Sequence, residues 1–221
     1  MSSLEAWNTV VRPADDPAAL EEAVSWLQQG QPVAFPTDTV YGLGVAMDDV
    51  GGLERLCQIK ERPRQMGIPL LLAEAEDVQR VCPDVPEAAW RLARRFWPGG
   101  LTLVLARRPE VPALVTGDHP GVAVHLPAHT VPRELARRLG RPLAASSANL
   151  AGSPSPVTAA EVLAQLGGRI PLILDGGVCP EGQASTIVDL LEDPPVLRRA
   201  GPVPRAALEA ILGAVRGPDQ T

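Results

Sequence analysis

Short apolar runs alternate with amphipathic segments along this chain, and this alternation constrains the fold more than any other feature. The runs that predict strands fall at residues 31–35, 45–47, 69–73, 101–106, 122–126, 142–146, 171–174, 186–190 and 196–199. The segments that predict helices fall at residues 16–30, 52–60, 86–97, 131–139, 158–166 and 204–215. Because both types of element occur throughout, the pattern predicts one α/β domain with a twisted, mixed sheet flanked by helices.

The length of the chain agrees with one domain. A domain of 221 residues can bury about 70% of the surface of its unfolded state. Strands 101–106 and 122–126 follow each other with no clear helix between them, so we expect antiparallel pairing in that part of the sheet. We expect the domain to span residues 17–215, with a lead-in at 1–16 and a flexible tail at 216–221.

Composition excludes several classes of protein. The net charge of −6 opposes a non-specific nucleic-acid coat, although arginine clusters at 91–95, 137–141 and 198–199 leave a local basic groove open. No apolar run approaches the roughly 18 residues of a membrane span, and residues 1–5 lack the start of a signal peptide. Three widely spaced cysteines form no disulfide framework, so we expect a reducing cytoplasm.

The three histidines are the candidate metal ligands. They are His119, His125 and His129, and Pro120 and Pro127 interrupt any helix that could align them. We therefore predict no metal site built from protein ligands.

Lys60 is the only lysine in the sequence, and the other nineteen basic residues are arginines. Lysine is a compact charge on a flexible stem, which suits it to reach a phosphate. Arg62 lies two residues further on, near the end of a predicted helix, so we expect Lys60 to be partly exposed there. A cation pair in this place also complements a helix dipole without binding any ligand.

Polar residues gather where predicted strands end. Residues 37–41 place hydroxyl groups before Gly42 and Gly44, residues 144–156 are small and rich in serine, and residues 184–201 add hydroxyl groups and two arginines. Glycines and small residues let a backbone approach a ligand closely. The common phosphate cradles, GxxxxGK[ST] and GxGxxG, are absent from the sequence.

Together these segments resemble the YrdC/Sua5 family, the threonylcarbamoyl-AMP synthases. The matching pieces are Pro36–Gly44, Lys60-x-Arg62-Pro63, Trp97-Pro98-Gly99-x-Leu101-Thr102-Leu103-Val104, Ser147-Ala148-Asn149, Ser185–Asp189 and Arg199-x-Gly201. They occur in the family's order between about residue 20 and residue 212. The match is to the short, single-domain form, and it implies a YrdC-like fold with a large, positively lined cavity.

The resemblance also implies a reaction. ATP, L-threonine and bicarbonate, with Mg²⁺, would give threonylcarbamoyl-AMP and pyrophosphate for t6A37 modification of transfer RNA. The threonine carbamate is itself the nucleophile, so catalysis would consist of positioning and charge stabilisation. The family further implies tRNA-modification proteins as partners, and double-stranded RNA binding has been attributed to it.

The resemblance assigns roles to individual residues. The catalytic set would be Lys60, Arg62, Ser147 and Asn149. Contacts with the nucleotide would come from Arg62, Ser147, Ser155 and Arg199. Contacts with threonine would come from Thr39, Tyr41, His125, Ala145 and Ser185.

The chain departs from the family at several positions, mostly on the threonine side. His125 stands where the family usually has Arg, Ile68 where it has Lys or Asn, and Ala73 where longer members have His. About two extra residues lie between Pro63 and Pro69. Two alternatives therefore stay open: a paralogue that adenylates another carbamate or small acid, and a non-catalytic RNA-binding or ribosome-associated module.

Overall fold

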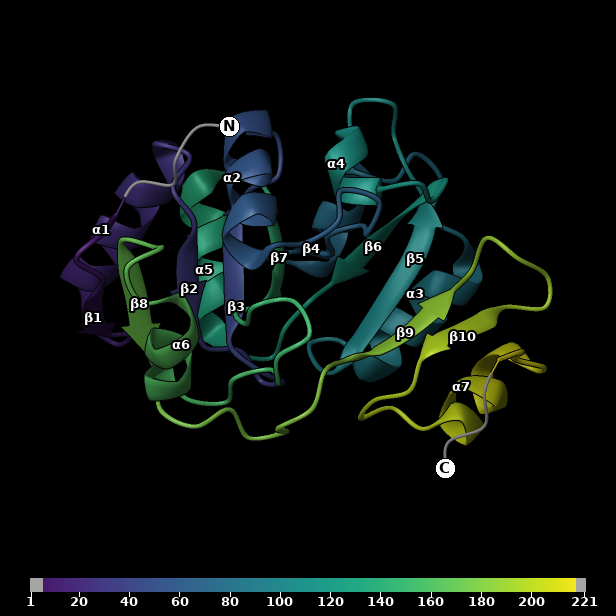
Figure 1. The fold of residues 1–221 in the computed structure, drawn as a ribbon. Coiled ribbons are helices and arrows are strands. Elements are labelled where there is room, and N and C mark those ends of the chain that lie inside the picture. The colour runs from purple at the N-terminus through teal and green to yellow at the C-terminus, as the bar shows by residue number, and fades with distance from the viewer. Residues whose placement is uncertain (1–5, 218–221) are drawn as a thin grey trace.

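The computed structural model describes residues 6–217, and the predictions made for residues 1–5 and 218–221 lie outside this range. Within it, ten strands form one mixed sheet in the order β1-β8-β2-β3-β7-β4-β6-β5-β9-β10 (Figure 1). The strands are β1 (Val10–Pro13), β2 (Val33–Phe35), β3 (Gly42–Ala46), β4 (Leu70–Leu71), β5 (Leu101–Ala106), β6 (Gly121–His125), β7 (Leu143–Ser147), β8 (Leu172–Asp175), β9 (Thr186–Asp189) and β10 (Val196–Arg199). The predicted mixed sheet is confirmed.

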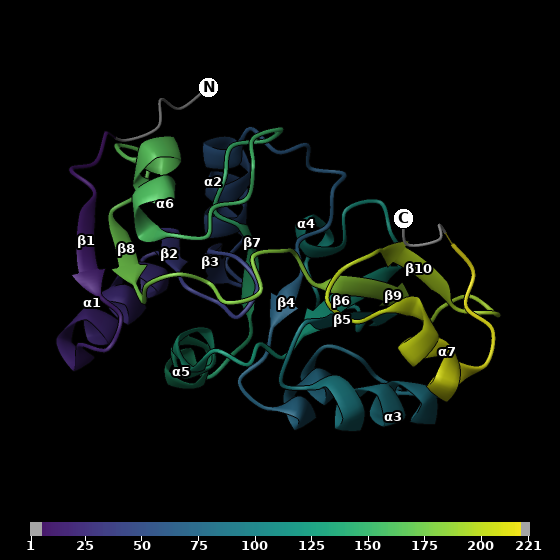
Figure 2. The ribbon, with the colours of Figure 1, turned by 90° about the horizontal axis from the view of Figure 1, so that it is seen from below.

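Helices cover both faces of the sheet. They are α1 (Pro17–Gln28), α2 (Val50–Lys60), the 3-10 helix η1 (Ala75–Arg80), α3 (Glu87–Phe96), α4 (Ala113–Thr116), α5 (Thr130–Leu139), α6 (Ala159–Leu166) and α7 (Arg205–Leu212). Figure 2 shows α1, α3 and α5 on one side of the sheet and α2 and α6 on the other. No helix in the described range is long and apolar enough to cross a membrane.

Local sequence signals place several helix starts. Asp16 precedes Pro17, and its carboxylate accepts a hydrogen bond from the backbone of Ala18 at 2.9 Å, which caps α1 as predicted. Asp49 caps α2 in the same way, so that helix begins two residues before the predicted start at residue 52. Thr158 caps α6 as predicted.

Predictions for two elements of the domain need correction. The strand predicted at residues 45–47 instead spans Gly42–Ala46. A β-carbon at Gly42 or Gly44 would approach the Phe35 ring to 2.8 or 3.0 Å. These glycines therefore make room for Phe35 within the sheet. The short helix α4 lies between β5 and β6, where we expected none, although the two strands pair antiparallel as predicted.

Segments near both ends of the described chain pair with strands of the sheet. β1 was not predicted, yet it pairs in parallel with β8, so the segment expected as a lead-in supplies an edge strand. Arg216, the first residue of the predicted tail, forms a β-bridge with Val196 in β10.

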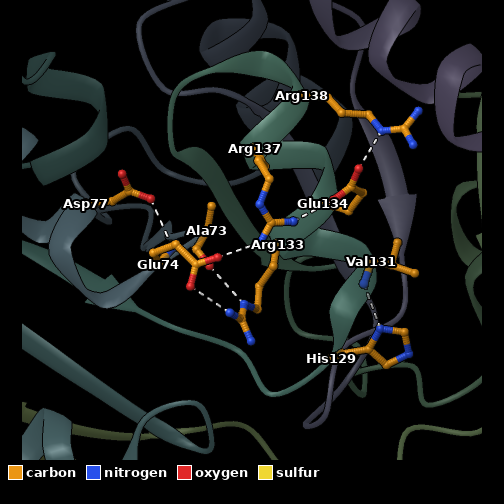
Figure 3. A network of polar contacts seen from close by, with 9 residues as sticks. All are labelled: Ala73, Glu74, Asp77, His129, Val131, Arg133, Glu134, Arg137 and Arg138. Atoms are coloured by element: carbon orange, nitrogen blue, oxygen red, sulfur yellow. Dashed lines mark hydrogen bonds and ion pairs between the residues drawn. The ribbon is translucent and has the colours of Figure 1, made fainter.

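The two-residue strand β4 occupies the middle of the sheet. It pairs antiparallel with β7 through Leu70 and Leu71, and in parallel with β6 through the same two residues. The segment after β4 is fixed to α5, because Arg133 donates to the carbonyl of Ala73 at 2.9 Å and forms an ion pair with Glu74 (Figure 3). Ala73 and Ile68, two of the departures from the family, are buried.

Candidate active site

A cavity of about 500 Å³ lies against one face of the sheet. Its floor is formed by alternate residues of neighbouring strands, as expected where side chains of period two share a face. These residues are Thr102 and Val104 on β5, Ala123 and His125 on β6, and Ile187 and Asp189 on β9. The walls come from the segments after β2, α2 and β7, where the polar clusters of the sequence lie.

All but two of the predicted site residues line this cavity. The lining set includes Thr39, Tyr41, Arg62, His125, Ala145, Ser147, Ser155, Ser185 and Arg199. Lys60 and Asn149 do not line it. The structure thus brings nine predicted residues, which are spread along the sequence from Thr39 to Arg199, together at one site.

Arginines supply the cations of the cavity. Arg62 donates to the carbonyl oxygens of Gly67 at 2.7 Å and Met66 at 3.2 Å, and Arg199 donates to Ser185 O at 2.8 Å and Ser185 Oγ at 3.0 Å. Burial lowers the pKa of both arginines, and the charge of Arg62 lowers that of Arg199 further. Two cations that repel each other across a cavity favour an anion between them.

A third arginine, Arg198, lines the cavity but is already paired. Its guanidinium lies 3.0 Å from the buried carboxylate of Asp189, which also contacts His119 at 3.1 Å. Arg64, the other cation near Arg62 in the sequence, is exposed, forms an ion pair with Glu54 and does not line the cavity. The net positive character of the lining stays a prediction.

The expectation that Lys60 is partly exposed is wrong. Only 3% of Lys60 is exposed, and its Nζ donates to the carbonyl oxygens of Ser147 and Asn149 and lies 3.3 Å from Asn149 Oδ1. Burial, and then the charge of Arg62, lowers the pKa of Lys60 to about 7. Removing this side chain would leave the carbonyl groups of Ser147 and Asn149 without their hydrogen-bond donor, so we expect the protein to lose stability.

Hydroxyl groups and one histidine also line the cavity. Ser185 Oγ lies 2.7 Å from Thr102 Oγ1, and Thr39 Oγ1 lies 3.0 Å from Thr37 Oγ1. His125 is buried, with Nε2 2.8 Å from Gly99 O, so Nε2 carries the proton and donates it to that carbonyl. Burial lowers the pKa of His125, and the nearby Arg199 adds to this effect, while Asp38 and the Gly99 bond oppose it.

Tyr41 lines the cavity, and its hydroxyl is hydrogen-bonded to the segment after β8. The hydroxyl accepts a hydrogen bond from Gly176 N at 3.2 Å and lies 2.9 Å from Gly177 O and 3.3 Å from Asp175 Oδ1. Burial raises the pKa of Tyr41 to about 12. The hydroxyl therefore holds the segment after β8 in place.

The sequence analysis assigned no role to Thr37 and Thr102, which line the cavity, or to Asp38, which follows Thr37. Asp38 is 5% exposed, and both of its carboxylate oxygens are buried with no hydrogen-bond partner among the described residues. All three lie within the segments that carry the family resemblance, so the motifs held the signal. In the described range, His119 and His129 accept bonds from backbone N–H groups, and no three metal-ligating side chains converge.

The twisted mixed sheet and its arginine-bearing cavity define a YrdC-like α/β protein. The family model Sua5_yciO_yrdC, described as "Telomere recombination", matches residues 25–201. The chain belongs to this family.

Several relatives are named for one activity. The chain is 42% identical over 194 residues to a threonylcarbamoyl-AMP synthase of Pyrococcus abyssi, covering 88% of this chain and 57% of that protein. It is 36% identical over 201 residues to a putative threonylcarbamoyl-AMP synthase of Mycobacterium tuberculosis, covering 91% and 92%. The chain thus spans less than two thirds of the length of the P. abyssi relative and nearly all of the mycobacterial one.

Solved structures agree with the fold. A crystal structure of P. abyssi Sua5 complexed with L-threonine aligns with a TM-score of 0.88 and 38% identity, covering 94% of this chain and 62% of that one. The crystal structure of E. coli YciO aligns with a TM-score of 0.77 and 26% identity, covering 90% and 96%.

Proposed function

We propose that this protein is an L-threonylcarbamoyladenylate synthase, a nucleotidyltransferase that acts on ATP, L-threonine and bicarbonate. One observation carries the proposal: a single cavity is lined both by the cations Arg62 and Arg199 and by the hydroxyl groups of Thr39 and Ser185. The cations suit a triphosphate, and the hydroxyl groups suit a small hydroxy amino acid. The names of the relatives and the threonine complex of P. abyssi Sua5 support the same assignment.

The reaction requires no protein nucleophile. The ammonium group of threonine and bicarbonate condense to a carbamate, releasing water and a proton. A carbamate oxygen then attacks the α-phosphorus of ATP, and the bond to the bridging oxygen of the β-phosphate breaks as pyrophosphate leaves. Fixed cations at the phosphates stabilise the charge that develops in the transition state. Holding the two reactants together in the cavity supplies the remaining rate acceleration.

The lining residues divide between the two substrates. Arg62, Ser147, Ser155 and Arg199 would contact the nucleotide. The amino acid would lie among Thr39, His125, Ala145 and Ser185, with Tyr41 beside it. Arg199 donates to Ser185 Oγ, so the two groups of residues are adjacent, and the carbamate would lie next to the phosphates.

Magnesium fits this proposal as a companion of the triphosphate. Asp189 is the acidic residue of the described cavity lining, and its carboxylate is already bonded to Arg198 and His119. Phosphate oxygens and water would therefore supply the ligands of Mg²⁺, which neutralises phosphate charge when it is bound.

The product would serve t6A37 modification of transfer RNA in the cytoplasm, with the proteins of that modification as partners. Any direct contact with RNA would need a local basic surface, because the chain carries a net charge of −6.

Pyrophosphate release from ATP tests the proposal. We expect release that requires both L-threonine and bicarbonate, with threonylcarbamoyl-AMP as the product in mass spectrometry. Release with another amino acid but not with threonine would indicate the paralogue. No release, together with RNA binding that falls steeply with salt, would indicate the binding module instead.

A further inference from the structure

The contacts of Lys60 with the loop of residues 147–153 point beyond substrate binding. The ammonium group has three N–H donors, and three oxygens of this loop lie within hydrogen-bonding distance: Ser147 O, Asn149 O at 2.6 Å and Asn149 Oδ1 at 3.3 Å. Lys60 is 3% exposed and does not line the cavity. A phosphate could receive a hydrogen bond from Nζ only if one of these bonds broke.

The backbone of Lys60 holds the same loop. Its carbonyl, in the last turn of α2, accepts a hydrogen bond from Ala151 N at 2.9 Å. Carbonyls at a helix end have no partner within the helix, so the Ala151 N–H supplies the missing partner of the Lys60 carbonyl. Lys60 therefore fastens the loop to α2 through its side chain and its main chain.

Asn149 carries the effect of Lys60 to the cavity wall. Its Oδ1 accepts from Lys60 Nζ and Ser147 Oγ, while its Nδ2 donates to Leu150 O at 2.9 Å and Ser153 O at 2.7 Å. An amide side chain has two donors and two acceptor sites, so the hydrogen-bonding capacity of Asn149 is used within the loop. Ser147 lines the cavity, and its hydroxyl donates to Asn149 Oδ1. Asn149, which does not line the cavity, therefore orients the Ser147 hydroxyl.

We propose that Lys60 is a positioning residue that shapes the 147–153 loop and orients Ser147, and that Arg62 and Arg199 make the phosphate contacts. This geometry also explains why position 60 has a lysine and not an arginine. Three oxygens converge on one point from the same loop, which suits a compact ammonium group and does not suit the planar fork of an arginine. The kinetic part of the inference rests on the proposed function, whereas the structural part does not.

Hydrogen exchange tests the structural part without any ligand. Lys60→Met keeps the length of the side chain and removes the donors, so we expect the amides of residues 148–153 to exchange at least about 10-fold faster while the β5–β6 ladder stays protected. Arg64→Met is the matched control, because Arg64 lies on the same segment, is exposed and pairs with Glu54. Unchanged exchange in Lys60→Met would overturn the proposal.

Pyrophosphate release tests the kinetic part. Misplacing the loop should lower kcat on the order of 10²-fold with little change in KM for ATP, and Lys60→Arg should not restore it. Asn149→Ala should produce the same defect, and the double variant should be no worse than the poorer single one. A large rise in KM for ATP at unchanged kcat, or additive losses, would instead make Lys60 a phosphate ligand.

The two proposals fail in different ways. If the wild-type protein releases no pyrophosphate, the proposed function is wrong and hydrogen exchange still decides the role of Lys60. If Lys60→Met does not fold, Asn149→Ala breaks the same network from the other end and takes its place in both experiments.

Discussion

Replacing His125 by arginine should strengthen the binding of threonine. His125 lines the cavity, and burial lowers its pKa, so the imidazole is neutral near pH 7. An arginine there would give the substrate carboxylate charged hydrogen bonds of about 1.5–3 kcal/mol. At roughly 1.4 kcal/mol per factor of ten, KM for threonine should fall about 10- to 100-fold. The effect should fall on KM, because the carboxylate is bound equally in the ground and transition states.

The same reasoning predicts a pH dependence. Protonation of His125 in the wild type should improve threonine affinity only below its ordinary range near pH 6.5, because its pKa is lowered. His125→Gln can still donate to Gly99 O but cannot become charged, so its KM should not vary with pH. Steady-state pyrophosphate release between pH 5.5 and 8 measures all three proteins, with melting temperatures as the check on folding. If KM of a folded His125→Arg protein equals that of the wild type, Arg199 already holds the carboxylate or threonine is not the substrate.

Three further predictions concern stability. Tyr41→Phe should cost about 0.5–1.5 kcal/mol in urea unfolding, because the part-buried hydrogen bonds of the hydroxyl with Gly176 N and Gly177 O are lost; an unchanged midpoint would contradict this. Gly117→Ala should destabilise the fold by more than Gly140→Ala, since both glycines have positive φ but only at Gly117 would a β-carbon come within 2.1 Å of a carbonyl oxygen. Burial lowers the pKa of His125 and His129, so stability should be full above about pH 6.5 and should decline as pH falls, because the unfolded chain binds more protons; a flat profile in urea between pH 5 and 7.5 would refute it.

Most elements of the fold could be predicted from hydrophobic periodicity and from capping residues in the sequence. The starts of α1 and α6 were predicted from their caps because a cap is a contact within three residues of sequence. The start of β3 was not predicted, since its glycines read as a loop until the ring of Phe35 is seen to occupy their space. β1 was missed because it is a short, largely exposed edge strand that contains a proline, and an edge strand of this kind has no apolar run.

The candidate site shows the same division between local and distant information. The motifs placed Arg62, Ser147 and Arg199 in one site, and the structure brings them to one cavity. The burial of Lys60 could not be predicted, because a helix end looks exposed until the loop that packs on it, almost ninety residues away, is known. The orientation of the Tyr41 hydroxyl depends on Gly176 and Gly177 in the same way.

The two-residue strand β4 gives the sheet a mechanical joint. It lies between the five strands on the β7 side and the four on the β6 side. Its ladders to β6 and β7 have two register pairs each, whereas β5 and β6 share five. A sheet bends more easily at a short ladder than at a long one. The two short ladders of β4 lie at the cavity, which Leu71 lines, between Ser147 on one half of the sheet and Arg199 on the other. A ligand that contacts both halves acts as a splint across the joint. Binding of such a ligand should therefore stiffen the sheet at β4, where its ladders are short.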